Sequence, residues 1–560
     1  MLQFSKLTAG LLVGLSFIAL VSAMPAAAAG PWDCSQARDI ALINGNIVTM
    51  GVPAQVSAVV IRDGRIVHLG PHGESQYTPC TKLFDLKGRT AVPGLIDGHI
   101  HFMSWGNRPG HDLRLDLATS VRDVQDLVRN RAADTAPGEW ITATGGWTTD
   151  QLAEKRLPTL AELDAAAPRN PVFVLTPDVL AATNSAGKAF LSAKGVTVSE
   201  DGGIPTADNQ SRLAYFYLVQ METPASQKRG IQEVMAQLAR LGVTTVSDMG
   251  WGGGNGTPAQ AWPSGTMNVY SSYDPLLELW REGKLTTRVR LSFNETNGQP
   301  PQLADRLKYL FPAFGDDMLK TLCMAEFITP GRVLPTPDYD EAARAVAQRG
   351  WCHEQHTPDP ATARHFIDIW EKVNAQYPIG SLHWRLAHVH ELDAPDLERL
   401  KALGAGVNVA PATWLTWSGL SSGGVPYRTI VHSGIHAGAM SDGPNYRPVN
   451  PWVHLYLMVT GKDSTGKLGA ADQTISRLEA IKLYTANNAW FVKEEDKLGS
   501  IEVNKLGDVV VLDRDYFSIP EEDIKKISPV LTVVDGRVVR RTSAVTELRG
   551  AAAKYHATEQ

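Results

Sequence analysis

The stretch PGLIDGHIHF, residues 93–102, places His99 and His101 one residue apart, directly after a Pro-Gly pair. In an extended strand, residues i and i+2 point to the same side. Two imidazoles on one side of a strand can bind one metal ion. A lone H-x-H pattern, however, more often occurs by chance in a surface strand. The rest of the sequence therefore has to decide between these interpretations.

The segment that follows alternates between apolar stretches and amphipathic stretches. Strand candidates include GVTTVSDMG (242–250), RVRLSF (288–293), LCMAEFI (322–328) and GVNVAP (406–411). Helix candidates between them include residues 223–242, 338–350 and 393–404. This alternation is typical of parallel strands with crossover helices, and eight such units close into a barrel. We predict an α/β fold with a (β/α)8 TIM-like barrel over residues 93–495, carrying an insertion at about 105–230.

Short strand patterns also occur at both ends of the chain. DIALINGNIVTM (39–50) and SAVVIRDGRIVHLG (57–70) lie near the start, and LGDVVVLDRD (506–515) and PVLTVVDGRVV (529–539) lie near the end. Strand clusters at opposite ends of a chain can pair into one module. We therefore expect the barrel to be inserted in a small β-sandwich built from residues 30–92 and 496–545, followed by a tail at 546–560.

The first residues differ from the rest of the chain. A short segment with one lysine precedes the apolar run LTAGLLVGLSFIALVSAM, and PAAAAG then supplies small residues. This layout is typical of a cleaved secretory signal over residues 1–29, with a retained membrane anchor as the alternative. The mature protein is expected to be periplasmic or secreted, without stable membrane insertion after cleavage.

Composition and cysteine content narrow the function classes. The chain has 560 residues and a net charge of −6, and no Lys/Arg-rich run suggests a nucleic-acid partner. Four cysteines allow three pairings, which the sequence does not distinguish. Cys34 and Cys80 flank the same N-terminal region, which favours them as partners. For Cys323 and Cys352, a disulfide and buried free thiols both stay open.

Residue types that bind metals recur where the predicted barrel strands end. GWCHEQHTPD ends one strand at His356, WRLAHVHEL ends another at His388 or His390, and HAGAMSDGP ends a late strand at Asp442. Each histidine alone is more often an ordinary polar residue. Together with His99 and His101 they form a much stronger signal, because the carboxyl ends of barrel strands point into one shared site.

These segments resemble the amidohydrolase superfamily, and in particular amidohydrolase family 3, over nearly the whole mature chain. AVPGLIDGHIHF, RGWCHEQHTPDPATA, RLAHVHELDAPDLERLKALG and AMSDGP are similar to the family's strand motifs. The resemblance implies metal ligation by His99, His101, His356 and His388, and selects His388 over His390. It also implies that Asp442 is the catalytic acid and base. The resemblance implies a divalent metal cofactor, with zinc as the expected metal and one or two ions per chain.

The chain departs from the family pattern at three places near the site. Members often have a lysine on the fourth strand that bridges two metals, but here Lys320 lies too early and Glu326 stands nearest that position. A glutamate can bridge two cations directly, so Glu326 is predicted to be a metal ligand, with an outer role at a one-metal site as the alternative. Val179 replaces a histidine that usually faces substrate, and Ala387 precedes His388 where a glutamate is usual.

The resemblance implies hydrolysis of a carbon–nitrogen bond, amide or cyclic amide, in a small organic substrate. Trp105, Trp147 and Trp414 follow strand ends and are predicted to shape the substrate pocket. A lactonase or esterase reaction at the same site is one alternative, and a metal-binding regulatory or sensor protein without catalysis is another. The sequence leaves the oligomeric state open, with a homo-oligomer as one outcome.

Overall fold

A computed structural model describes most of the chain. It covers residues 34–35, 37–71, 73–250, 273–294, 300–329, 336–357, 359–389, 392–410, 425–462, 466, 468–469 and 471–548. The predicted signal segment lies outside these residues, as does the end of the predicted tail. Among the described helices, none combines the length and hydrophobicity that a membrane span requires.

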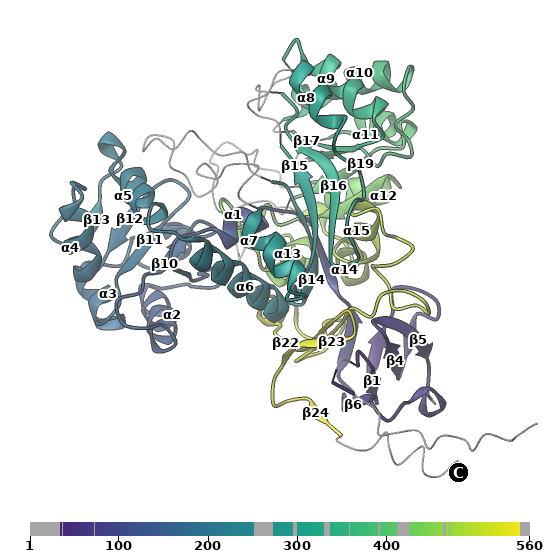
Figure 1. Cartoon of the computed structure of the whole chain (residues 1–560), viewed down its shortest axis with the longest axis horizontal. Helices are drawn as coiled ribbons and strands as arrows, with labels where there is room; N and C mark the ends of the chain where they lie inside the picture. Colours follow the sequence, from purple (N-terminus) through teal and green to yellow (C-terminus); the bar gives the residue numbers. More distant parts are fainter. Residues whose placement is uncertain are drawn as a thin grey trace, which may run out of the picture.

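An eight-stranded parallel sheet forms the centre of the molecule (Figure 1). The prediction of a parallel α/β barrel is confirmed, because the sheet runs in chain order and its first and last strands approach each other. Its strands are β8 (Leu95–Ile100), β14 (Val243–Asp248), β15 (Arg288–Phe293), β16 (Leu319–Glu326), β17 (Cys352–His356), β18 (Arg385–Ala387), β19 (Gly406–Val409) and β20 (His436–Ala439).

Hydrogen bonds link the two end strands of this sheet. The side-chain amide of Asn488 donates to the carbonyls of Ile96 on β8 and Ala439 on β20, at 2.6 Å each. Just beyond the strand ends, the backbone N–H of Asp442 donates to the carbonyl of His99 at 2.9 Å. These contacts draw the end of β20 onto the end of β8, which places residues from the first and last strands at one edge.

Amphipathic helices cover the barrel. α6 (Pro224–Leu241) begins after the N-cap Thr223 with proline at its first position, and ends at Gly242, whose φ of +80° suits the left-handed cap conformation. The other helices are α1 (Phe102–Gly106), α7 (Asp274–Arg281), α8 (Pro300–Leu307), α9 (Tyr339–Gln348), α10 (Pro360–Asn374), α11 (Ala394–Ala402), α12 (Tyr427–His432), α13 (Pro451–Thr460), α14 (Arg477–Leu483) and α15 (Ala486–Phe491).

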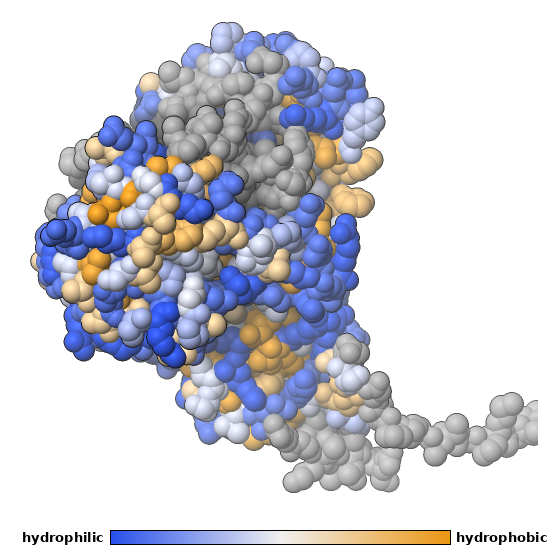
Figure 2. Space-filling view, turned by 60° about the vertical axis from the view of Figure 1, so that its left-hand side comes forward, coloured by the Kyte–Doolittle hydropathy of each residue, from blue (hydrophilic) through white to orange (hydrophobic). Residues whose placement is uncertain are grey.

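A separate lobe occupies most of the predicted insertion and lies to one side of the barrel (Figure 1). Its own five-stranded sheet has the order β13-β12-β11-β10-β9. On the face shown in Figure 2, hydrophilic and hydrophobic residues of the molecule are interspersed. The lobe comprises β9 (His111–Asp112), α2 (Val121–Ala133), β10 (Ile141–Thr144), α3 (Leu160–Ala166), β11 (Val172–Leu175), β12 (Ala181–Thr183), α4 (Ser185–Ala193), β13 (Gly203–Ile204) and α5 (Gln210–Val219).

Two further sheets combine strands from both ends of the chain and enclose one apolar core. The first contains β1 (Ile40–Ile43), β4 (Val59–Arg62), β5 (Arg65–Leu69), β6 (Lys82–Asp85) and β24 (Thr546–Glu547). The second contains β2 (Asn46–Val48), β3 (Gln55–Val56), β7 (Thr90–Pro93), β21 (Val509–Leu512), β22 (Pro529–Val534) and β23 (Arg537–Arg541). Strand β24 lies within residues 546–560, which were predicted to form a tail. The sequence does not reveal this strand, because a two-residue edge strand has no hydrophobic pattern.

A buried ion pair joins the barrel to this sandwich. Arg288 on β15 donates to both carboxylate oxygens of Asp508, the residue before β21, at 2.8 and 2.9 Å, and Arg290 on the same strand pairs with Glu494 within the barrel segment. These side chains are almost fully buried. Since removing one partner of a buried pair leaves an uncompensated charge, the two modules are held in one arrangement.

Both cysteine pairs form disulfides in the structure, Cys34 with Cys80 and Cys323 with Cys352. For Cys323 and Cys352 the sequence left a disulfide and free thiols open, and the structure has the disulfide. The two residues stand directly opposite each other on the paired strands β16 and β17, a register that the sequence does not reveal.

Candidate metal centre

Six of the predicted residues lie at the carboxyl ends of barrel strands. Because parallel strands of a barrel end at the same rim, this placement brings together side chains that are up to 343 positions apart. The positions are His99 on β8, His101 just after it, Glu326 at the end of β16, His356 at the end of β17, His388 just after β18 and Asp442 shortly after β20.

Four of these residues form a group with the geometry of a cation site. His99, Glu326, His388 and Asp442 each offer one ligand atom, and these atoms lie within 4.8 Å of one another. Nε2 of His99 lies 2.7 Å from Oε1 of Glu326, and Nε2 of His388 lies 3.9 Å from Oε2 of the same carboxylate, with all of these side chains buried. Imidazole nitrogens and carboxylate oxygens that converge in this way are the ligand types that bind a metal ion such as zinc.

The carboxylate of Glu326 stands between two pairs of histidines. Its Oε1 lies 2.7 Å from Nε2 of His99 and 3.4 Å from Nε2 of His101. Its Oε2 lies 3.0 Å from Nδ1 of His356 and 3.9 Å from Nε2 of His388. Each oxygen therefore faces a different pair, which is the arrangement that a carboxylate bridging two cations requires.

Asp442 faces the first of these pairs. Its Oδ1 lies 3.2 Å from Nε2 of His101 and 3.4 Å from Nε2 of His99, while its Oδ2 accepts a hydrogen bond from Arg447 at 2.5 Å. The backbone at Asp442 has a φ of +52° and that at His388 a φ of +64°. Residues other than glycine rarely adopt these angles, and such conformations cluster at functional sites.

The charges and burial of the clustered side chains favour a bound cation among them. Burial alone raises the pKa of Glu326, but His99 and hydrogen bonds from neighbouring histidines hold it well below its ordinary value. Burial lowers the pKa of His99, yet the charges of Glu326 and Glu354 raise it well above the usual range. Burial lowers the pKa of His388 to about 4, so this imidazole is neutral at pH 7, as a metal ligand must be.

A second layer of residues holds His99 in place. Nδ1 of His99 is hydrogen-bonded to the carboxylate of Glu354, so the proton lies on Nδ1 and Nε2 faces the centre. Glu354 in turn accepts from Arg385 at 2.5 Å, and Arg385 contacts the Cys323–Cys352 disulfide. The sequence analysis missed Glu354, although it lies two positions before His356 on one strand and therefore on the same side.

We expect Glu354→Gln to weaken metal binding by about 10- to 100-fold, because the amide no longer orients and polarises the imidazole of His99 as the carboxylate does. The dissociation constant, measured by competition with a chelator of known affinity, checks this. Glu479→Gln is a matched control, since Glu479 bonds His432 at 2.9 Å on an exposed part of the protein. Equal metal affinity of Glu354→Gln and the wild type would contradict the role.

The other predicted residues have different surroundings. Trp105 lies on α1 and donates from its indole N–H to Asp112 at 2.8 Å. Trp147 is 0% exposed and belongs to the hydrophobic core of the insertion, so its environment is that of a packing residue. Lys320 lies six positions before Glu326 on β16 and pairs with Glu494 and Asp317. Trp414 and His390 fall outside the described residues.

We expect Trp147→Ala to lower the free energy of unfolding by about 3–5 kcal/mol, because it removes a large side chain from a closed core. The measurement is the denaturation midpoint of the purified protein, with KM for substrate determined in parallel. Trp280→Ala, at a partly buried position, serves as the control. An unchanged denaturation midpoint with a raised KM would instead support the predicted contact with substrate.

Comparison with known proteins identifies the family. Residues 82–540 match the amidohydrolase family. The chain belongs to this family. As an amidohydrolase it is a metal-dependent hydrolase acting on carbon–nitrogen bonds, as the resemblance of its strand motifs had indicated.

The similarity to known proteins covers nearly the whole of this amidohydrolase. An N-substituted formamide deformylase of Arthrobacter pascens is 24% identical over 546 residues, covering 90% of this chain and 98% of its own. The crystal structure of an uncharacterized metal-dependent hydrolase from Pyrococcus furiosus covers 86% of this chain and 100% of its own, with a TM-score of 0.57 and 23% identity. Atrazine chlorohydrolase TrzN from Arthrobacter aurescens TC1, complexed with zinc, covers 93% and 98%, with a TM-score of 0.52 and 14% identity.

Proposed function

We propose that this amidohydrolase is an exported, zinc-dependent enzyme that hydrolyses an amide or cyclic amide bond of a small organic molecule. The observation that carries the proposal is the convergence of buried histidine and carboxylate ligand atoms at the carboxyl rim of the barrel. The formamide deformylase similar to this chain supports the choice of a carbon–nitrogen bond.

The donor set suits zinc, which takes imidazole nitrogen and carboxylate oxygen. His99, His101, His356, His388 and Asp442 would hold one or two such ions, together with Glu326, whose carboxylate lies among the histidines. When bound, a divalent cation lowers the pKa of a water molecule toward about 7 and polarises the scissile carbonyl.

The chain's own residues manage the proton. Asp442 is positioned to accept the proton of the attacking water on its carboxylate and then to donate it to the leaving nitrogen. Its hydrogen bond from Arg447 fixes the orientation of the carboxylate, and with the surrounding histidines it holds the pKa of Asp442 well below the ordinary value against the effect of burial. Asp442 therefore starts the cycle ionised, as a general base must.

Paired assays of the purified protein test this function. The substrates are a panel of N-substituted formamides, N-acyl compounds and cyclic amides, each beside the ester or lactone of the same shape. We expect amide hydrolysis that is lost after chelation and restored by added zinc. Faster turnover of the oxygen analogues would establish the lactonase or esterase alternative, and metal binding without turnover of any substrate would favour a regulatory protein.

Export is part of the proposal and rests on the N-terminal sequence alone. The mass of the protein recovered from the periplasm or medium checks it. We expect a mass corresponding to cleavage after Ala28 or Ala29. The full-length mass in a membrane fraction would instead indicate a retained anchor.

A further inference from the structure

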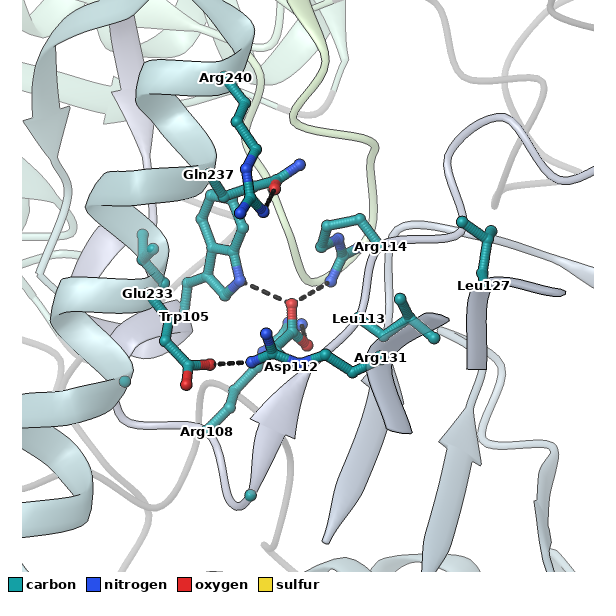
Figure 3. Close-up of a pocket in the computed structure, with 13 residues that line it drawn as sticks. Trp105, Arg108, Asp112, Leu113, Arg114, Leu127, Arg131, Glu233, Gln237 and Arg240 are labelled. Carbon is teal, nitrogen blue, oxygen red and sulfur yellow. Dashed lines mark hydrogen bonds and ion pairs between the residues drawn. The ribbon is translucent and has the colours of Figure 1, made fainter. Parts of the chain in front are cut away.

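A second cavity lies where the insertion meets the barrel, separate from the metal centre. It has a volume of about 230 Å³ and lies between β9 and α2 of the insertion on one side and α6 on the other (Figure 3). Its charged lining consists of Arg108, Arg114, Arg131 and Arg240, with Asp112 and Glu233. Asp116, just outside this lining, also pairs with Arg114 at 3.6 Å, so four guanidinium groups meet three carboxylates and leave a formal excess of one positive charge.

The two carboxylates are already shared among several donors. Asp112 accepts from the indole of Trp105 at 2.8 Å and from Arg114 at 3.4 Å, and it lies 3.5 Å from Arg108. In Figure 3 the dashed lines from Trp105 and Arg114 meet at this carboxylate. Arg114 also faces Asp116, whose Oδ1 lies 3.6 Å from its Nε, so Arg114 has two carboxylates beside it whereas Arg108 shares Asp112 with Arg114.

Glu233 is shared in the same way on the opposite wall. It accepts from Arg131 and lies 2.7 Å from Nδ1 of His111. Arg240, on the exposed end of α6, donates a long hydrogen bond to Gln237 at 3.4 Å. Within the described part of the chain, this arginine at the rim of the cavity forms no ion pair with a carboxylate.

Arginine atoms within the wall also lack partners. The side chain of Arg108 is 1% exposed, and its Nε makes no hydrogen bond within the described residues, as is also true of Nε in Arg131. Burial lowers the pKa of Arg108 to about 10 in spite of Asp112, and the cation of Arg114 adds to this effect. Buried donors without acceptors are costly, and an oxygen-rich anion would satisfy them.

We propose that this junction cavity binds a phosphate-sized oxyanion, either inorganic phosphate or the phosphate group of a small organic monoester. Guanidinium groups match the geometry of phosphate oxygens, and the remaining excess of positive charge favours an anion. The inference is independent of the reaction at the metal centre.

The cavity wall is connected to the segment that carries Asp442. Arg108 donates to the side chain of Asn445 at 2.7 Å, and the backbone N–H of Gly146 donates to the carbonyl of the same residue at 3.3 Å. Arg114 donates to the carbonyl of Gly145 at 2.6 Å. An anion that orders these arginines therefore also holds the insertion against the loop beyond Asp442.

Calorimetric titration of the full protein with inorganic phosphate, at constant ionic strength, tests the proposal. We expect one site per chain with a dissociation constant of about 1 mM or tighter, which corresponds to about −4 kcal/mol. Arg131→Gln and Arg240→Gln should each weaken binding by about 3- to 10-fold, and Arg240 is exposed, so its substitution leaves the fold intact. Arg122→Gln is the matched control, because Arg122 lies on the same helix as Arg131 and is 73% exposed.

A variant of the metal centre separates the two sites. Phosphate bound at the metal would be lost in His101→Asn, whereas binding at the junction persists in that variant. Titration with glycerol phosphate distinguishes a monoester site from a site for free phosphate by which ligand binds more tightly. The proposal is overturned if phosphate does not bind, if binding is lost in His101→Asn, or if Arg131→Gln and Arg240→Gln both bind as the wild type does.

Discussion

Asp442→Asn is expected to lower kcat by about 10²- to 10⁴-fold, the usual contribution of general acid–base catalysis. The amide keeps the size of the side chain and one oxygen that faces His101 and His99, but it cannot accept and return a proton. KM should change little, because the substitution removes a proton-transfer step rather than a binding contact. Steady-state kinetics together with elemental analysis of metal content provide the measurement.

The control is a matched aspartate–arginine pair away from the centre. Asp396 pairs with Arg364 at 3.0 Å on the outside of the barrel and is also buried. Asp396→Asn should leave kcat and metal content unchanged. If Asp442→Asn loses its metal together with its activity, Asp442 acts chiefly as a ligand and another group moves the proton. If it keeps full activity, the proposed role of Asp442 is wrong.

The barrel could be predicted because its signal is repeated along the sequence. Each crossover unit pairs an apolar strand with an amphipathic helix, so an error in one unit does not change the architecture. The ligand positions benefit from the same regularity. Once the barrel is assumed, His99, His356 and Asp442 must all lie at one rim, because each follows a strand that runs in the same direction.

The sheet to which a strand belongs is harder to predict from the sequence. β10 (Ile141–Thr144) and β11 (Val172–Leu175) are short, apolar and parallel, as barrel strands are, yet they pair within the insertion. Their pairing is decided by long-range contacts rather than by their own composition. Trp147 illustrates the consequence, because a tryptophan after a strand points to a substrate pocket only if that strand belongs to the barrel.

The sequence pattern also does not reveal which residues contact each other inside the core. Glu354 contacts His99 from 255 positions away, and Cys323 meets Cys352 through the register of two strands. Local propensity contains no information about register between neighbouring parallel strands, which is fixed by the packing of all eight. The alternation of Glu354 with His356 could have indicated an inward side chain, but not the histidine that it contacts.

Glu326→Ala is expected to reduce the metal content from about two ions per chain to one or fewer. It should also lower kcat/KM by about 10³-fold or more, because a cation contributes several kcal/mol to stabilisation of the transition state. The reason lies in the geometry, since Oε1 of Glu326 lies near His99 and His101 while its Oε2 lies near His356 and His388. Without the carboxylate, the two pairs lose the oxygen ligand that lies between them.

Lys320→Met is the informative control for this substitution. Lys320 is the lysine of the same strand, but it pairs with Glu494 and Asp317 rather than with the histidines. Its loss should leave metal content at the wild-type level, even if it lowers stability. One ion per chain in both the wild type and Glu326→Ala would contradict the bridge and reduce Glu326 to a residue that orients His356. One ion in the wild type and none in Glu326→Ala would make it a ligand of a single metal. Two ions falling to one, with Lys320→Met unchanged, would establish that a glutamate bridges the metals in this amidohydrolase.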